Sequence, residues 1–135
     1  MKSDVAKILI VDDDDKILFA FREVLKKEGY KSIVARNGEE GLEKISAMSP
    51  DVVFMDITMP KLDGLDALRR IKEQNPFMPV IIITGYGTMQ TAIKAMQLGA
   101  FEYLTKPLDV DKIREVTRRA LASIRCAPLV CFANF

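Results

Sequence analysis

The sequence predicts an α/β fold in which one parallel sheet is covered by helices on both faces. Short apolar runs alternate five times with segments whose apolar residues recur at helical spacing. Strict alternation of this kind needs a crossover between successive strands, and crossovers make the strands parallel. We therefore expect a doubly wound, three-layer sandwich built from five βα units.

The five runs have the composition of strands buried in a sheet, because each holds three or four residues rich in Val, Ile or Phe. They are Ile8–Val11, Ile33–Ala35, Val52–Met55, Val80–Ile83 and Phe101–Leu104. The first, third and fourth runs are apolar throughout, which suits central strands. Polar residues accompany the second run (Lys31, Ser32) and the fifth (Glu102, Tyr103), which suits edges. Strand order 2-1-3-4-5 meets this pattern, and it is the order of flavodoxin-like sheets.

Each run is followed by a helical segment with an apolar stripe for the core. In chain order the stripes are Ile17, Phe21, Val24 and Leu25; Leu42, Ile45 and Met48; Leu65, Leu68 and Ile71; Ile93 and Met96 with small alanines; and Val110, Ile113, Val116, Ala120, Leu121 and Ile124. Asn37 with Glu40 resembles a capping box, and Asp109 is a candidate N-cap. Gly29 and Gly99 fall where helices should stop.

The chain has the size and composition of one globular domain, with 135 residues, 49% of them hydrophobic and 29% charged. We expect this domain to span residues 1–125 and a separate tail to span residues 126–135. Pro128 should block continuation of the last helix, and the apolar residues after it lack helical spacing. A native extension, a docking segment and a cloning remnant all fit the tail.

Composition excludes several classes of function. Twenty basic and 19 acidic residues leave a net charge of +1, without the basic run of a direct nucleic-acid binder. The absence of histidine excludes His-based catalysis and His-ligated metals within the chain. No stretch is long enough to cross a bilayer, and no signal-peptide core follows the first residues. With both cysteines (Cys126, Cys131) in the tail, the expectation is a cytoplasmic protein.

Polar residues gather at the predicted carboxyl ends of the strands, where open parallel sheets bind their ligands. The first strand ends in four aspartates, the third in Asp56, the fourth in Thr84 and the fifth near Lys106. Because the first and third strands are neighbours, Asp12 and Asp13 should converge with Asp56. Asp14 and Asp15 are more simply the cap of the next helix, and Asp63-Gly64 a turn and helix start.

These residue types suit phosphoryl transfer to a carboxylate. Three carboxylates in one pocket repel one another unless a cation is present, and oxygen-only ligation suits Mg²⁺. A carboxylate can accept a phosphoryl group as an aspartyl phosphate. Mg²⁺, the Lys106 amine and the Thr84 hydroxyl could then each satisfy one phosphoryl oxygen.

The sequence also resembles the receiver domain of bacterial two-component response regulators. The segments that carry the resemblance are ILIVDDDD, VVFMDITMPKLDG, PVIIITGYG and GAFEYLTKPLD, and it extends from about Lys7 to Arg125. It implies that Asp56 is the phosphoacceptor and that Asp13 binds Mg²⁺ directly. Asp56 itself and the backbone carbonyl of Thr58 complete the protein ligands of the ion, with Asp12 in its outer shell.

The resemblance implies a two-state switch as well. Lys106 and Thr84 would stabilise the phosphoryl group, and Lys106–Pro107 is the candidate cis peptide bond. Thr84 would move toward the phosphoryl group and Tyr103 into the space vacated, which changes the partner preference of the face formed by the fourth helix, fifth strand and fifth helix. Thr58 and Tyr86 are expected to govern access of hydrolytic water.

The partners implied are a sensor histidine kinase, a downstream output domain or effector, and a second copy on phosphorylation. The segment GYGTMQTAIKAMQLGAFEYLTKPLD looks most like receivers of nitrogen-regulation-type, enhancer-binding transcription activators. The chain would then be a phosphoacceptor regulatory domain rather than an enzyme, acting in transcription regulation without touching nucleic acid or membrane itself.

Two other functions remain open at this point. A strand followed by Asp-x-Asp also opens the haloacid-dehalogenase-type phosphatases, in which Asp12 would be the nucleophile and Asp14 the general acid. Against this, Asp15 stands where those enzymes usually have Thr or Val. A flavin- or nucleotide-binding module would need a Ser/Thr/Gly-rich anion cradle after the first strand, where this chain has four aspartates.

Overall fold

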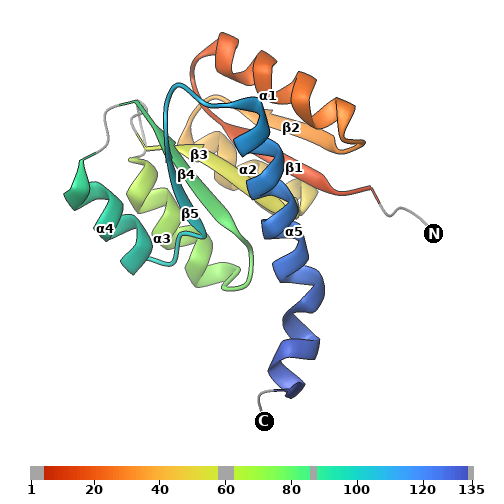
Figure 1. Ribbon diagram of the computed structural model, residues 1–135. Helices are drawn as coiled ribbons and strands as arrows, with labels where there is room; N and C mark the ends of the chain where they lie inside the picture. The colour runs from red at the N-terminus through yellow and green to blue at the C-terminus, as the bar shows by residue number, and fades with distance from the viewer. Residues whose placement is uncertain (1–4, 58–62, 86–87, 134–135) are drawn as a thin grey trace.

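The computed structural model describes the backbone of residues 5–57, 63–85 and 88–133, and the side chains of these residues up to Ile124. Five parallel strands form one sheet in the order β2-β1-β3-β4-β5, as predicted (Figure 1). The strands are β1 (Lys7–Val11), β2 (Lys31–Ala35), β3 (Val52–Asp56), β4 (Val80–Thr84) and β5 (Glu102–Thr105). The two strands with polar residues lie at the edges, where solvent can reach those residues.

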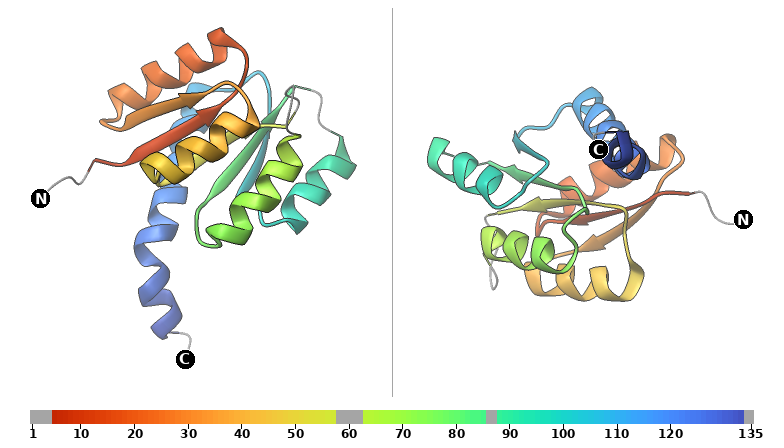
Figure 2. Two further views of the ribbon diagram at one scale, coloured as in Figure 1. Left: turned by 180° about the vertical axis from the view of Figure 1, so that it is seen from behind. Right: turned by 90° about the horizontal axis from the view of Figure 1, so that it is seen from below.

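A helix follows each strand and packs on one face of the sheet (Figure 2). The helices are α1 (Asp15–Lys27), α2 (Gly38–Met48), α3 (Gly64–Gln74), α4 (Met89–Gln97) and α5 (Val110–Ala133). Buried residues of α1 and α5 share one hydrophobic cluster with the sheet, and those of α2, α3 and α4 share the other. The three-layer, flavodoxin-like sandwich is confirmed.

Alternation along the strands supplies both halves of the core. In β1, Ile8 and Ile10 face α1 and α5, whereas Leu9 and Val11 face the opposite layer. β3 and β4 are buried on both faces, as central parallel strands must be. On the α1 side the rings of Phe21 and Phe54 meet at 4.9 Å between centroids. This packing holds the strand ends in a fixed register.

The helix boundaries follow the predicted caps. The Asn37 side chain accepts a hydrogen bond from the Glu40 amide, which is the first half of a capping box. The Glu40 carboxylate accepts from the Arg36 amide and not from the Asn37 amide, so the second half of the box does not form. Asp63 caps α3, which confirms the predicted helix start at Asp63-Gly64. Gly29 and Gly99 end α1 and α4 with positive φ angles, which glycine adopts without steric cost.

Two predictions about the helices are wrong. Ile93 and Met96 of α4 are 51% and 49% exposed, and Val110 at the start of α5 is also exposed. α4 instead buries Ala95, because a methyl group allows close packing on the sheet while the longer side chains point outward. α5 continues past Pro128 to Ala133, so Pro128 does not end the helix. Proline has a φ angle that a helix can accept. What it costs the helix is one backbone hydrogen bond and a clash with the preceding turn.

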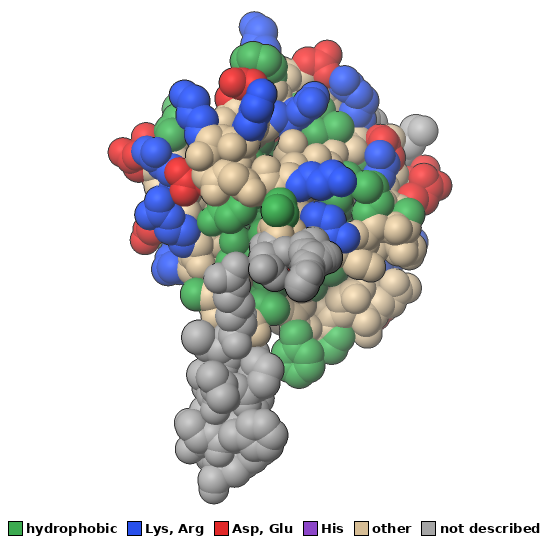
Figure 3. Space-filling view, turned by 90° about the vertical axis from the view of Figure 1, so that its right-hand side faces the viewer, with side chains coloured by type: hydrophobic (Ala, Val, Ile, Leu, Met, Phe, Trp, Pro, Cys, Tyr) green, Lys and Arg blue, Asp and Glu red, His purple; other side chains and the backbone are tan. Residues whose placement is uncertain are grey.

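Charges are mixed on the surface. Figure 3 shows one face of the molecule, on which Lys and Arg side chains are interspersed with Asp and Glu side chains. This mixture agrees with the net charge of +1. None of the helices in the described part of the chain combines the length and apolar character that crossing a membrane requires.

Candidate functional site

The carboxyl ends of three central strands bring the predicted site residues together. Asp56 is the last residue of β3 and Thr84 the last of β4, while Asp12 follows β1 directly. Val11 pairs with Met55, so Asp12 and Asp56 come next to each other along neighbouring strands. The Asp12 amide donates to the carbonyl of Ala35, 3.0 Å away, which extends the β1 ladder by one residue. The sheet itself therefore positions both carboxylates.

Asp12, Asp13 and Asp56 form a compact acidic cluster. One carboxylate oxygen from each lies within 4.8 Å of the other two. Asp12 and Asp56 are 0% and 3% exposed, whereas Asp13 is exposed. Oxygen ligands at the mouth of a buried acidic pocket fit a hard divalent cation, and Mg²⁺ uses one or two carboxylates with several waters. The donor set therefore fits the predicted ion.

Lys106 supplies the positive charge of the site. Its Nζ lies 3.0 Å from Oδ2 of Asp56, to which it donates a hydrogen bond, and 3.0 Å from Oδ2 of Asp12, with which it forms an ion pair. The Lys106 amide donates to the carbonyl of Thr84 at 2.8 Å, so this residue continues β5 by one position. The Lys106–Pro107 peptide bond is cis, as expected.

The electrostatics of the pocket are not balanced by the protein alone. Burial raises the pKa of Asp12, and the neighbouring Asp56 carboxylate adds to that rise, although the Asp14 amide and Lys106 oppose it. Partial burial alone would lower the pKa of Lys106, but its contacts with Asp12 and Asp56 outweigh burial and raise it. Among the described residues, one ammonium faces three carboxylates, which leaves an excess of negative charge that a cation would neutralise.

Asp14 and Asp15 take no part in the acidic cluster. The Asp14 side chain accepts a hydrogen bond from the Lys16 amide and caps α1, as the simpler interpretation predicted. Asp15 forms an exposed ion pair with Arg36 at 2.5 Å. The phosphatase hypothesis needs Asp14 as a general acid beside Asp12, but this exposed carboxylate is engaged at the helix start instead.

The two predicted switch residues lie on the same face of the sheet. Tyr103 of β5 pairs with Ile82 of β4, and two residues further along both strands Thr105 pairs with Thr84. Because side chains two residues apart share a face, Tyr103 and Thr84 are diagonal neighbours on the α4 side. Thr84 is fully buried and Tyr103 partly buried. Thr58 and Tyr86, for which roles were also predicted, lie outside the described residues.

Sequence reasoning missed the close approach at Gly64. A Cβ there would lie 2.4 Å from the Ile57 Cα and 2.8 Å from the Asp56 carbonyl oxygen. Any side chain would therefore displace either α3 or the strand end that carries Asp56. The sequence predicted only that Asp63-Gly64 starts a helix. It does not show how close Gly64 lies to the end of β3.

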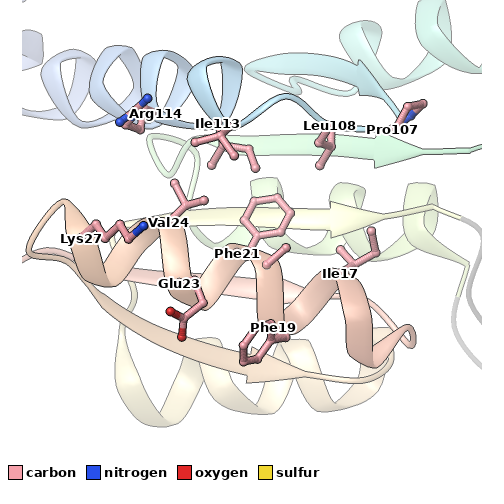
Figure 4. A pocket seen from close by; sticks show the side chains of 12 residues that line it. Ile17, Phe19, Phe21, Glu23, Val24, Lys27, Pro107, Leu108, Ile113 and Arg114 are labelled. Carbon is pink, nitrogen blue, oxygen red and sulfur yellow. The ribbon is translucent and has the colours of Figure 1, made fainter.

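Sequence reasoning also missed an apolar groove of about 690 Å³ between α1 and the start of α5 (Figure 4). Ile17 and Pro107 line its end near the acidic site, and Lys27 and Arg114 line its far end. Phe19 projects at its side and is 66% exposed. The sequence signal for this groove was Phe19 itself, a large aromatic residue that lies outside the apolar stripe by which α1 faces the core.

Comparisons with known proteins agree with the geometry. Residues 8–118 match the response regulator receiver domain. Transcriptional regulatory protein ZraR of Klebsiella oxytoca is 40% identical over 125 residues, covering 93% of this chain and 28% of that protein. DNA-binding transcriptional regulator NtrC of Escherichia coli K12 is 39% identical over 115 residues, covering 85% and 24%. The solution structure of the beryllofluoride-activated NtrC4 receiver domain dimer gives a TM-score of 0.82 at 35% identity, covering 87% of this chain and 97% of that one.

The chain thus spans about a quarter of the length of the curated relatives that it matches. The matched segment contains the acidic cluster, Thr84, Tyr103 and Lys106. Receiver domains are signalling domains of regulators rather than enzymes, which decides against the phosphatase hypothesis. The chain belongs to the response regulator receiver domain family, and its relatives are nitrogen-regulation-type transcription regulators.

Proposed function

We propose that this receiver is a phosphorylation-activated switch that accepts a phosphoryl group on Asp56, from a sensor histidine kinase or a small phosphodonor. The observation that carries the proposal is the position of Asp56. Its carboxylate ends a central strand, lies within 4.8 Å of two further carboxylates and accepts a hydrogen bond from Lys106. That arrangement offers a nucleophile, a cation site and a fixed positive charge in one pocket.

In the proposed reaction, an Asp56 carboxylate oxygen attacks the phosphorus of the donor. The new O–P bond forms as the bond from phosphorus to the leaving group breaks, and the leaving group departs with the electron pair. Bound Mg²⁺ would neutralise charge on the phosphoryl oxygens. Asp13, Asp56 and the Thr58 carbonyl would hold the ion, with Asp12 in the outer shell.

Lys106 and Thr84 would stabilise the transferred group. Lys106 already pairs with Asp56, so its ammonium can follow the negative charge from the carboxylate to a phosphoryl oxygen. The Thr84 hydroxyl would hydrogen-bond a second oxygen. Movement of Thr84 would then allow Tyr103 to move on the same face of the sheet, and the surface of α4, β5 and α5 would change its partner preference.

The groove between α1 and α5 suits the phosphodonor domain of a histidine kinase. Its Pro107 end adjoins Lys106, which contacts Asp56, so a protein seated in the groove would lie beside the phosphoacceptor. Exposed Phe19 and Val110 offer the apolar area that a protein partner would bury. Lys27 and Glu23 also line the groove, and Arg114 is already paired with Asp111 and Glu28, so the contact would depend mainly on apolar area.

The output of the switch would be transcription regulation in the cytoplasm, through an output domain or effector, as the regulatory names of the relatives suggest. A homodimer on phosphorylation is a further part of the proposal. Exposed Met89, Ile93 and Met96 form an apolar stripe on α4, and the beryllofluoride-activated NtrC4 receiver domain is described as a dimer.

The proposal is tested by incubating the protein with Mg²⁺ and acetyl phosphate and measuring its intact mass. The wild type should gain one phosphoryl group, and Asp56→Asn should gain none. Asp12→Asn should still be labelled, more slowly, because Asp12 is not the nucleophile. Labelling that survives in Asp56→Asn and disappears in Asp12→Asn would instead support the phosphatase mechanism.

A further inference from the structure

The hydroxyl of Thr91 joins Tyr103 to the first turn of α4. Its Oγ1 lies 2.9 Å from the Tyr103 hydroxyl, across 12 positions of sequence. The same Oγ1 accepts a hydrogen bond from the Thr88 amide at 2.9 Å and donates to the Thr88 carbonyl at 2.9 Å. Thr88 caps α4 in turn by accepting from the Thr91 amide at 3.1 Å. One hydroxyl therefore belongs both to a helix cap and to a contact with β5.

The Thr91 hydroxyl has a small bonding capacity, which its backbone partners largely use. A threonine hydroxyl has one proton and two lone pairs. Its proton is directed to the Thr88 carbonyl, and one lone pair accepts from the Thr88 amide. The Tyr103 hydroxyl, at 2.9 Å, and the Thr88 Oγ1, at 3.3 Å, both lie near the remaining lone pair, and in each pair either hydroxyl could be the donor. The tyrosine is the nearer of the two and the one that belongs to another element.

This contact lies on the path between the phosphorylation site and α4. Tyr103 and Thr84 are diagonal neighbours on one face of the sheet, and Thr84 is the last residue of β4 beside Asp56. Besides its Thr88 cap, the first turn of α4 has little buried side-chain area among the described residues, since Met89 is exposed and the buried residue of the helix is Ala95, further along. If Tyr103 moves away, the first turn of α4 is therefore the part of the helix that loses a contact.

We propose that Thr91 is a positioning residue of the switch, which anchors the Tyr103 hydroxyl and the α4 cap together in the resting state. The inference rests on the proposed function for its link to phosphorylation, but the anchor itself exists without phosphate. When Tyr103 leaves, the Thr91 hydroxyl loses one partner, and the first turn of α4 becomes easier to open.

The first test measures amide hydrogen exchange in the unphosphorylated protein. Tyr103→Phe removes the hydroxyl and keeps the ring, so exchange at the Ala92 amide, which donates to the Thr88 carbonyl, should rise about fivefold. A net hydrogen bond of about 1 kcal/mol corresponds to that factor. In a Thr91→Val background, Tyr103→Phe should add nothing, because the partner is already gone. In a Thr88→Ala background, where the cap oxygen is lost but Thr91 remains, the effect should persist.

The second test titrates beryllofluoride, a phosphoryl mimic, with Mg²⁺ present. If phosphorylation and the anchor favour opposite states, loss of the anchor must strengthen binding of the mimic. Tyr103→Phe should lower the half-saturating concentration about fivefold in the wild-type background and leave it unchanged in Thr91→Val. An equal effect in both backgrounds, or unchanged Ala92 exchange in Tyr103→Phe, would overturn the anchor. Failure of every variant to bind the mimic, with the exchange results as expected, would overturn the proposed function instead.

Discussion

Replacing Asp12 by asparagine should stabilise the protein when no divalent cation is present. Asp12 is fully buried, and burial raises its pKa, so its ionised form opposes folding. Asparagine keeps the shape, and its amide oxygen can still accept the hydrogen bond that Oδ1 receives from the Asp14 amide at 2.9 Å. Its amide nitrogen then replaces Oδ2 at 3.0 Å from Lys106 Nζ, so two donors would meet and the ammonium must turn toward Asp56. Lys106 keeps its hydrogen bond to Asp56, so the substitution leaves no buried charge unpaired.

The distances set the size of the effect. At an effective dielectric constant of about 20, Lys106 at 3.0 Å attracts the Asp12 carboxylate by about 5 to 6 kcal/mol. Asp56, with a carboxylate oxygen within 4.8 Å, repels it by at least about 3 kcal/mol, and exposed Asp13 adds a smaller repulsion that solvent screens. Repulsion therefore offsets much of the attraction, and the burial cost opposes the rest. We expect Asp12→Asn to raise the free energy of unfolding by about 1–2 kcal/mol at pH 7.

Urea unfolding in a chelating buffer measures this gain, and Asp14→Asn is the matched control. Asp14 is exposed, and asparagine caps helices as well as aspartate does, so the control should lie within about 0.5 kcal/mol of the wild type. A raised pKa in the folded state means that the wild type loses stability as the pH rises from the ordinary carboxyl value of 3.8 through the raised one. The advantage of Asp12→Asn should therefore shrink as the pH falls toward 4.

Added Mg²⁺ should reverse the ranking, because an ion that binds the folded wild type stabilises it by about 2.7 kcal/mol at one hundred times its dissociation constant. Asp12→Asn, with one carboxylate fewer, should gain less. A loss of 1 kcal/mol or more in Asp12→Asn without cation would refute the reasoning. It would mean that the attraction of Lys106 exceeds repulsion and burial together.

Three further predictions follow from other contacts. Gly64→Ala should lower the free energy of unfolding by about 1–3 kcal/mol and slow phosphorylation, because its Cβ would overlap the backbone at Ile57. Gly85→Ala is the control and should change stability little, because its Cβ would lie in ordinary contact with Lys106 Cδ, at 3.8 Å. Lys106→Met should weaken beryllofluoride binding at least about tenfold, as expected for loss of a half-buried charge-assisted contact, and Lys106→Arg should lose less. Equal binding by all three proteins would contradict its role. Phe19→Ser should slow transfer from a phosphorylated histidine kinase but not from acetyl phosphate, whereas Phe77→Ser, exposed on the turn before β4, should affect neither.

Much of the site could be predicted because a parallel sheet converts sequence order into position. Asp12, Asp56 and Thr84 each end an apolar run, and the carboxyl ends of adjacent parallel strands meet at one edge. The relative positions of these side chains can therefore be predicted from the strand order alone. The strand order follows from the polar residues Lys31 and Glu102, which mark the edge strands.

The rest depends on packing that spacing does not encode. α4 is nine residues long, and its five apolar residues spread over a wide arc of the helix, so its pattern fits more than one orientation. Ile93 was assigned to the wrong side. The contact of Thr91 with Tyr103 depends on how that helix lies against β5. The double pairing of Lys106 depends on a side chain long enough to reach two strands.

The central claim is that Asp56 carries the phosphoryl group, and reductive trapping tests it most directly. Borohydride converts an aspartyl phosphate into homoserine, which peptide mass spectrometry locates in the sequence. After incubation with acetyl phosphate and Mg²⁺, homoserine should appear at position 56 and be absent when phosphodonor is omitted. Homoserine at position 12, with aspartate intact at position 56, would contradict the claim.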